Sequence, residues 1–435
     1  MKLTIFYGDK GDCLLLTSRD NRSILCDGGM PSSFPDFVAP KLRAALPDGG
    51  GLDVVYVSHI DEDHIGGVLK LLDQALDWKV FRLHAAAGDD QFNAPKSPEP
   101  ARIMNIWHNA FHEIVGENAG DIQDMLAANA LSLRLLDAKW ARYAGAVSAN
   151  LANSIPQAMR VSRRVSASQL GIPLNKPADG KLMMTRKDVG STNVGTMKIT
   201  TIGPAPEDLT KLRHDWDKWL GNQANRATVR KIREEAGKDE DRLKTSFPPA
   251  DAGRFLAALK VLGDRDAVTP PNLASLMFHV EEDDQTILLT GDGHTDDVVK
   301  GLEATGKLAN EQGLHVNVLK VPHHGSEHNT TRTFPRRVTA DHYVFCGNGF
   351  SENPDLDIVK LYLSSRLGKP SELSPNNEAE QPFHFWFSCT SDLVPNKYKP
   401  HMRQVEDLVR QAEADNSQKL TVHFLTDEPL VLALN

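Results

Sequence analysis

The side chains best suited to chemistry lie in one short stretch, which reads Ser-His-Ile-Asp-Glu-Asp-His over residues 58–64. An apolar, β-branched run over residues 53–57 precedes it and predicts a buried strand, and an apolar helical pattern follows it. Open α/β sheets place their ligands at the carboxyl ends of strands. Carboxylates packed this closely repel one another unless a cation lies between them. The stretch therefore predicts a cation site, and the alternative is a solvated acidic turn with two incidental histidines.

Two further predicted strands end in residues of the same kind. The run 286–290 precedes Asp292, and the run 315–321 precedes His323 and His324. Imidazole and carboxylate suit divalent transition metals, and no cysteine lies among these residues. The donors suffice for two ions that share a bridging carboxylate. Such a pair lowers the pKa of a bridging water, so that a metal-bound hydroxide exists at neutral pH, and it also neutralises the oxygens of an ester.

The elements that must position these residues follow the order of a layered α/β fold. Periodicity and turn residues predict the following elements along the chain. Strands are expected over 2–7, 13–17, 23–26, 53–57, 79–84, 196–202, 315–321, 341–346, 384–387 and 420–425, a hairpin over 273–280 and 286–290, and helices over 37–46, 296–305 and 357–366.

Two long segments interrupt this order. Residues 91–190 predict a mainly helical insertion, with helices over 103–115 and 122–144, and residues 205–262 predict a charged helical insertion. The whole chain is expected to form one domain. Its first half covers about 1–90, its second half about 195–350, and a C-terminal extension covers 351–435. We expect the insertions to carry specificity or to offer a surface to a protein partner.

Composition excludes several classes of protein. Of the 435 residues, 40% are hydrophobic and 25% are charged, which is typical of a soluble globular protein. The net charge of −9 argues against broad nucleic-acid binding, although a local basic groove is compatible with it. The four cysteines form no CxxC pair, and neither a signal peptide nor an apolar run of membrane-spanning length is present. We therefore expect a cytoplasmic protein with reduced thiols and no membrane contact; the oligomeric state is left open.

Four motifs together resemble those of the metallo-β-lactamase superfamily. They are Asp27-Gly28-Gly29, His59-x-Asp61-x-Asp63-His64, Thr290-Gly291-Asp292 and Val321-Pro322-His323-His324-Gly325. Gly8-x-x-Gly11-Asp12, Asn272-x-x-Ser275 and His323-His324-Gly325-Ser326 also resemble the hydrolase domain of bacterial competence (DNA-uptake) channels. The resemblance implies a four-layer αββα sandwich, here with helical insertions, that holds two divalent metal ions.

The resemblance also implies a role for each residue of these motifs. His59 and Asp61 would bind the first metal, Asp63, His64 and His324 the second, and Asp292 would bridge the two. The superfamily usually has histidine where this chain has Asp61. This richer supply of oxygen leaves Mn²⁺ as an alternative to Zn²⁺. A further histidine of the first site is not identified, and His84 and His108 are expected to be structural.

The candidate catalytic residues are Asp63, His323 and His294. Each of the two histidines either orients a ligand by a hydrogen bond or acts as general acid to the leaving group. Asp27 is expected to hold a ligand or the backbone rather than a metal. Lys320, Ser326 and Asn329 could contact a phosphate or be ordinary strand-end and loop residues.

The resemblance to the competence subgroup implies a phosphodiesterase or nuclease, acting on a phosphodiester or nucleic-acid substrate. Two alternatives stay open, because a shared fold does not fix the substrate. One is hydrolysis of a lactone, carbon ester or thioester. The other is a metal-binding scaffold whose insertions bind a protein partner.

Overall fold

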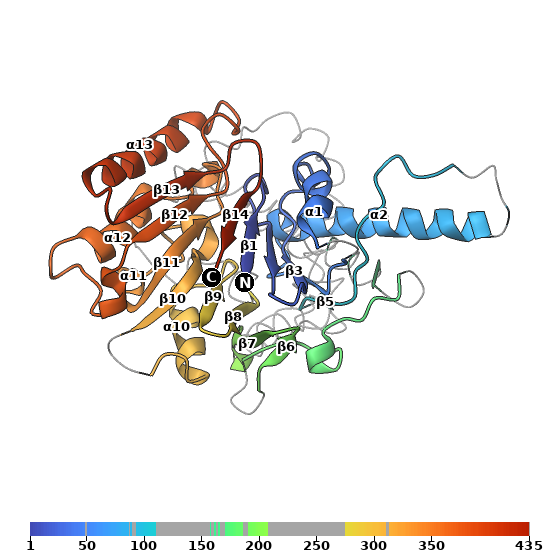
Figure 1. Cartoon of the computed structure of the whole chain (residues 1–435), viewed down its shortest axis with the longest axis horizontal. Helices are drawn as coiled ribbons and strands as arrows, with labels where there is room; N and C mark the ends of the chain where they lie inside the picture. The colour runs from blue at the N-terminus through green and yellow to red at the C-terminus, as the bar shows by residue number, and fades with distance from the viewer. Residues whose placement is uncertain are drawn as a thin grey trace, which may run out of the picture.

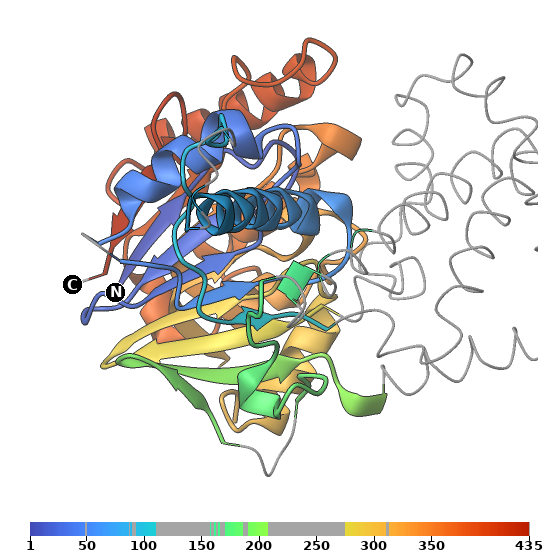
Figure 2. The same cartoon turned by 90° about the vertical axis from the view of Figure 1, so that its right-hand side faces the viewer.

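Two β-sheets pack face to face, and helices cover both outer faces, as the computed structural model shows (Figures 1 and 2). The expected four-layer αββα sandwich is therefore confirmed. Both views also place the two termini side by side. The structure describes residues 1–47, 50–86, 88, 93–109, 157, 161, 164–165, 170–185, 190–207, 275–309 and 313–434.

The first sheet has six strands in the order β14-β1-β2-β3-β4-β5. Strands β14, β1, β2 and β3 pair antiparallel, whereas β3, β4 and β5 pair parallel. The strands are β1 (Lys2–Ile5), β2 (Leu14–Thr17), β3 (Ser23–Cys26), β4 (Val54–Tyr56), β5 (Ile106–Trp107) and β14 (Leu430–Ala433). The helices beside this sheet are η1 (Phe34–Val38), α1 (Ala39–Ala45) and α2 (Glu62–Ala86).

The second sheet has eight strands in the order β13-β12-β11-β10-β9-β8-β7-β6. Its strands are β6 (Thr192–Val194), β7 (Met197–Gly203), β8 (Met277–Glu282), β9 (Gln285–Leu289), β10 (Leu314–Lys320), β11 (Val338–Phe345), β12 (Phe383–Phe387) and β13 (Leu420–Phe424). Its helices are α10 (Thr295–Ala304), α11 (Phe334–Arg337), α12 (Leu356–Leu367) and α13 (Lys399–Asp415). Short helical turns are η3 (Lys176–Ala178), η5 (Pro322–Gly325), η6 (Phe350–Glu352) and η7 (Asn377–Glu380).

Side-chain alternation builds the layers. Leu14 and Leu16 of β2 face the core between the two sheets, whereas Leu15 faces the outer core with α1 and α2. In β9 of the second sheet, Ile287 and Leu289 join the central core while Leu288 faces the helices on the other side. Burial of each of these side chains contributes roughly 1.5–3 kcal/mol. Both sheets are thereby fixed face to face, with their strand ends at a common edge.

Two predicted elements are wrong. Residues 79–84, expected as a strand, form the last turns of α2, which runs without interruption from Glu62 to Ala86. After Gly67 this helix contains neither glycine nor proline, so nothing in the sequence stops it earlier. In the expected helix over 103–115, the described residues 103–109 are not helical and contain β5, which pairs with β4 at the edge of the first sheet. Residues 110–115 lie outside the described residues.

Residues 351–435, expected as an extension, take part in both sheets. Strands β12 and β13 extend the second sheet beyond β11, and β14 pairs with β1 in the first. Most of the predicted insertion over 91–190, including its helix over 122–144, lies outside the described residues. The predicted charged insertion over 205–262 also lies outside them, except for residues 205–207.

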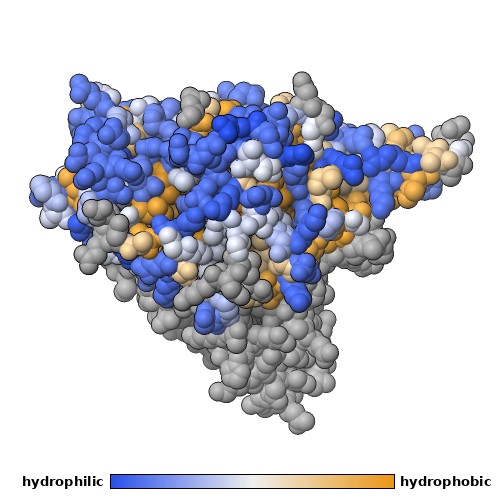
Figure 3. Space-filling model, turned by 60° about the horizontal axis from the view of Figure 1, so that its bottom comes forward, coloured by the Kyte–Doolittle hydropathy of each residue, from blue (hydrophilic) through white to orange (hydrophobic). Residues whose placement is uncertain are grey.

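None of the described helices combines the length and the apolar character needed to cross a membrane. Hydrophilic residues dominate the described part of the face in Figure 3, and hydrophobic residues appear there in small patches. All four cysteines are buried and carry free thiols, as the sequence predicted.

Candidate metal centre

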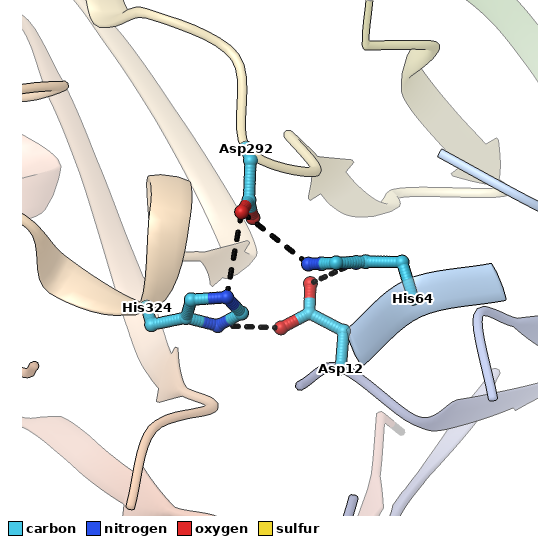
Figure 4. Close-up of side chains that lie close together, drawn as sticks. All are labelled: Asp12, His64, Asp292 and His324. Atoms are coloured by element: carbon cyan, nitrogen blue, oxygen red, sulfur yellow. Dashed lines mark ion pairs between the residues drawn. The ribbon is translucent and has the colours of Figure 1, made fainter. Parts of the chain in front are cut away.

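Ends of strands from both sheets meet at one place. The turn after β4 carries His59 and leads into His64, which lies in the first turns of α2. In the second sheet β9 and β10 are parallel neighbours, so Asp292 after β9 and His324 after β10 lie at the same edge. Figure 4 shows His64 entering from the first sheet's side and Asp292 and His324 from the second. The two halves of the chain thus contribute to one centre.

Four imidazoles converge on one carboxylate oxygen. The Nε2 atoms of His64, His324, His323 and His59 lie 3.3, 3.4, 3.5 and 3.7 Å from Oδ2 of Asp292. Asp292 itself is buried, with a side chain 3% exposed. A carboxylate surrounded in this way has the position that a ligand shared by two ions requires.

The protonation of His64 is set by its neighbour. Nδ1 of His64 lies 2.9 Å from Oδ2 of Asp27, and an ionised carboxylate only accepts hydrogen bonds. Nδ1 therefore carries the proton and donates to Asp27. The lone pair of the neutral ring is on Nε2, which faces Asp292. Metal-ligating histidines are oriented by this type of contact between the second ring nitrogen and a carboxylate.

His59 and His324 are oriented in the same sense. Oγ of Ser58 donates to Asp27 over 2.7 Å, so it can accept from Nδ1 of His59, which lies 3.0 Å away. Nδ1 of His324 lies 3.2 Å from Oδ1 of Asp12, another acceptor. In His59 the proton is thereby held on Nδ1, and in His324 the ion pair with Asp12 turns Nδ1 toward that carboxylate. In both rings Nε2 is directed toward the centre.

Two more carboxylates complete the arrangement. Oδ2 of Asp61 lies 3.7 Å from Nε2 of His59, and Oδ2 of Asp63 lies 3.7 Å from Nε2 of His324. Among the described residues, the Nε2 atoms of His59, His64 and His324 are buried and make no hydrogen bond. Buried lone pairs directed at carboxylate oxygens are unfavourable without a cation between them. The residues therefore fit a divalent metal ion.

The charges of the centre act strongly on one another. Although burial alone would raise it, the surrounding imidazoles hold the pKa of Asp292 well below its ordinary range. Burial alone would lower the pKa of His64 and His324, but Asp292 and the other nearby carboxylates hold it well above the ordinary value. Protons and metal ions thus compete for the same nitrogens.

Asp12 and Lys320 are part of the centre, although the sequence indicated Asp12 only as part of a motif and Lys320 only as a residue that could contact a phosphate. Nζ of Lys320 forms an ion pair with Oδ2 of Asp12, donates to the carbonyl oxygen of Gly291 over 2.8 Å and lies 3.6 Å from Oδ1 of Asp292. A possible metal-binding group is formed by Asp12, His64, Asp292 and His324 (Figure 4). Each offers one ligand atom, and these four atoms all lie within 4.8 Å of one another. The available signal was a lysine between the apolar residues Leu319 and Val321, at the end of a predicted strand.

The backbone at the paired histidines is strained. His323 and His324 have φ of 43° and 56°, in the left-handed region that side chains other than glycine rarely adopt. Each such residue costs on the order of 1–3 kcal/mol and persists where its surroundings determine it. Here the N–H of His323 donates to the carbonyl of Gly291 over 3.2 Å, and that of Ser326 donates to the carbonyl of His323 over 2.9 Å. The strained turn is therefore held at the end of β9.

A glycine turn holds the other half of the centre. The N–H of Gly28 donates to the carbonyl of His64 over 3.0 Å, and the N–H of Gly67 donates to the carbonyl of Gly29 over 2.9 Å. A Cβ atom on Gly28 would collide with the backbone of Gly67 and Val68. The turn therefore packs directly on α2 and places the carboxylate of Asp27 beside His64.

The remaining candidate histidines lie in other surroundings. Nδ1 of His294 accepts from the N–H of Asp296 over 3.2 Å and so caps α10. His84 lies in the last turn of α2, about 30 Å along the helix from His64 at ~1.5 Å per residue. The backbone of His108 exchanges hydrogen bonds with the side chain of Asn175, at 2.7 and 2.8 Å.

Comparisons with known proteins agree with the sequence motifs of the first half. Residues 7–84, less than half of the chain, match the family "Metallo-beta-lactamase superfamily". This segment includes the glycine turn and all four candidate ligands between His59 and His64. No curated protein matches the sequence.

Two solved structures are distantly similar to this chain. The metallo-β-lactamase fold protein YhfI from Bacillus subtilis is 12% identical, with a TM-score of 0.35 over 99% of this chain and 98% of that chain. Zn²⁺-bound PqqB from Methylobacterium extorquens is 11% identical, with a TM-score of 0.34 over 100% of each chain. At TM-scores this low, neither likeness supports a conclusion about this chain.

Proposed function

We propose that this protein is a metal-dependent hydrolase with two divalent ions, Zn²⁺ or Mn²⁺, and that it cleaves phosphodiesters. One observation carries the proposal: the Nε2 lone pairs of three oriented imidazoles point at a single buried carboxylate oxygen. His59 and Asp61 would hold the first ion, Asp63, His64 and His324 the second, and Asp292 would lie between them.

Charge supports the number of ions. Five carboxylates meet at the centre, those of Asp12, Asp27, Asp61, Asp63 and Asp292, and one buried ammonium, that of Lys320, lies among them. With neutral imidazoles this leaves four negative charges. Two divalent ions neutralise them with every imidazole neutral, whereas with one ion the two remaining charges would have to be balanced by protons on His64 and His324, whose pKa the carboxylates raise.

Lys10 supports an anionic substrate. Its side chain is half-buried, with Nζ 4.6 Å from the centre of the Phe350 ring. Although burial lowers it, Asp63 and Asp61 raise the pKa of Lys10, so its ammonium stays charged beside the metal ligands. Asp9 and Glu62 also act on this ammonium, so it is not an unbalanced charge. Its N–H groups can donate to the anionic oxygens of a phosphodiester.

When bound, the ions would act as Lewis acids on the ester and lower the pKa of a coordinated water. The chain's own residues hold the ligands in place: Asp27 orients His64, Ser58 orients His59, and Asp12 orients His324. Asp61 supports phosphodiester rather than carbon-ester cleavage, because it makes the first site richer in oxygen. The likeness of the motifs to competence hydrolase domains points the same way.

Turnover of bis(p-nitrophenyl) phosphate with added Zn²⁺ or Mn²⁺ tests the proposal. We expect activity in the wild type, loss in Asp63→Ala and His64→Ala, and no change in His315→Asn, which removes an imidazole from β10 outside the centre. p-Nitrophenyl acetate, a lactone and a thioester are the parallel substrates. Activity on these substrates alone would show that the protein cleaves carbon esters, lactones or thioesters rather than phosphodiesters.

Single-stranded DNA and RNA extend the same assay. The net charge of −9 favours a small phosphodiester over a long nucleic acid. A protein that holds two metals and cleaves no phosphodiester, DNA or RNA would contradict the phosphodiesterase and favour a scaffold that binds a protein partner.

A further inference from the structure

The two proposed metal sites have unequal numbers of protein donors. Beside the shared Asp292, the second site has Asp63, His64 and His324, whereas the first has only His59 and Asp61. A structural Zn²⁺ site has four protein donors, whereas a catalytic site has three protein donors and keeps a position open for water or substrate. The first site is therefore one protein donor short of the second.

Asn329 determines the orientation of the His323 ring. Its side chain is buried, and its Nδ2 donates to the backbone carbonyl oxygen of Asp292 over 2.8 Å. A rotated amide would place Oδ1 against that carbonyl, acceptor against acceptor, so the assignment of nitrogen and oxygen is fixed. Oδ1 then points at Nδ1 of His323 and forms a hydrogen bond with it. Nδ1 of His323 must donate that hydrogen bond.

A proton on Nδ1 leaves the lone pair of a neutral His323 on Nε2. This atom lies 3.5 Å from Oδ2 of Asp292, the oxygen on which the other three imidazoles converge. His323 and His324 are not redundant, because their ring centroids are 5.6 Å apart and their planes differ by 68°. The His323 side chain is 25% exposed against 5% for His324, so it reaches the same oxygen from the more open side.

We infer that Nε2 of His323 is the donor that completes the first metal site, together with His59, Asp61 and Asp292. This inference rests on the proposed two-metal function and deepens it. It replaces the role of general acid expected for His323, because a neutral ring that donates its Nδ1 proton to Asn329 has no proton on Nε2. It also accounts for two consecutive left-handed residues, which bring the Nε2 atoms of both His323 and His324 to Oδ2 of Asp292.

Metal content per chain, measured after dialysis against a weak chelator, tests the inference. The variant is His323→Asn, since asparagine tolerates the left-handed backbone of this position better than most residues while its side chain is too short to reach Asp292. We expect two ions in the wild type and one in His323→Asn. His315→Asn, the matched loss of an imidazole, keeps two.

Co²⁺ titration gives a readout that does not depend on activity. In His323→Asn the absorption bands of one of the two Co²⁺ ions should be lost or shifted. Asn329→Ala leaves the imidazole in place but frees its orientation, and should weaken the first site by roughly 10–100-fold. Asn329→Ala also tests the inference if His323→Asn does not fold.

The outcomes distinguish failure of the inference about His323 from failure of the proposed two-metal function. If the wild type and His323→Asn both hold two ions with equal affinity and equal Co²⁺ spectra, His323 is not a ligand, while the two-metal function stands. If the wild type binds no ion, the proposed function fails and the inference fails with it.

Discussion

The ammonium of Lys320 forms an ion pair with Oδ2 of Asp12, although the two side chains are only 2% and 4% exposed. Asp12 precedes β2 of the first sheet, and Lys320 is the last residue of β10 in the second. The pair therefore joins the two sheets directly behind the metal centre. Oδ1 of Asp12 lies 3.2 Å from Nδ1 of His324, so the ion pair also determines where that imidazole lies.

Loss of the ammonium should be strongly destabilising. In Lys320→Met the carboxylate of Asp12 remains buried without its partner, and breaking a buried pair from one side costs about 3–5 kcal/mol. Urea denaturation of the metal-free protein measures the change in the free energy of unfolding. The matched control is Lys300→Met, on the exposed face of α10, where we expect a change of about 0.5 kcal/mol or less.

The double variant Asp12→Asn/Lys320→Met separates the pair from the packing around it. Because both charges are then absent, its destabilisation should be smaller than the sum of the two single variants. Strict additivity would show that Lys320 stabilises the fold without acting through Asp12.

The sequence predicted those parts of the fold that depend on local patterns. The strands β1, β2 and β3, the β8–β9 hairpin and the helices α10 and α12 all follow from periodicity and turn residues within a few positions. The strand expected over residues 79–84 failed because a short β-like run cannot be distinguished from a continuing helix without its neighbours. At the end of the chain the strands predicted over 384–387 and 420–425 are confirmed as β12 and β13. Strand β14 was not predicted, since only the folded structure shows that it pairs with β1.

The candidate site was predictable in its residue types but not in its connections. Spacing indicated His59, His64, Asp292 and His324, because each follows a recognisable strand. The role of Lys320 depends on Asp12, more than three hundred positions earlier in the chain, and no local pattern connects them. The proton positions on the imidazoles also depend on hydrogen bonds that appear only in the structure.

Asp27 should control metal affinity without binding a metal. Its carboxylate accepts from Nδ1 of His64 and from the N–H and Oγ of Ser58, at 2.9, 2.8 and 2.7 Å. Asp27→Asn weakens the acceptor that fixes the His64 tautomer. Changes at such positions lower metal affinity roughly 10–100-fold. Competition with a chromophoric Zn²⁺ chelator measures this loss.

The control for Asp27 is a second carboxylate–imidazole contact outside the centre. Oδ1 of Asp341 lies 3.0 Å from Nε2 of His315, and Asp341→Asn should leave Zn²⁺ affinity unchanged. Equal Zn²⁺ affinities of Asp27→Asn and the wild type would show that Asp27 does not hold the metal ligands in place.

His342 should make the fold sensitive to acid. Burial, followed by the nearby His384, lowers the pKa of His342 to about 4. The unfolded chain takes up this proton near pH 6.5, so the folded state loses stability as the pH falls from about 6.5 to about 4. In His342→Asn, the amide oxygen can replace Nδ1 as acceptor for Nε1 of Trp386. The variant should lose about 1–3 kcal/mol less than the wild type over this range.

Urea denaturation at pH 7.5, 6, 5 and 4.5 measures the effect of His342→Asn. His401→Asn is the control, because it removes an imidazole from α13. Parallel losses of stability in the wild type and His342→Asn would show that His342 does not carry this pH dependence.

Asp355 should make the fold less stable as the pH rises. Burial, followed by the charges of Glu327, Glu352 and Asp357, raises the pKa of Asp355 to about 8. Between about pH 4 and pH 8 the folded state therefore keeps a proton that the unfolded chain releases, and stability falls as the pH rises. Asp355→Asn cannot ionise, but its amide oxygen can still accept from the N–H of Glu327, which lies 2.6 Å from Oδ2 in the wild type.

The Asp355→Asn variant should match the wild type near pH 4 and exceed it by about 1–3 kcal/mol near pH 8.5. Melting temperatures across this range measure the difference. Asp296→Asn removes an exposed carboxylate from the first turn of another helix, α10, and is the matched control. If the gap between Asp355→Asn and the wild type does not widen with pH, the carboxyl of Asp355 is already ionised in the folded protein. Its contact with Glu327 would then be a charge-assisted hydrogen bond that stabilises the turn after His324.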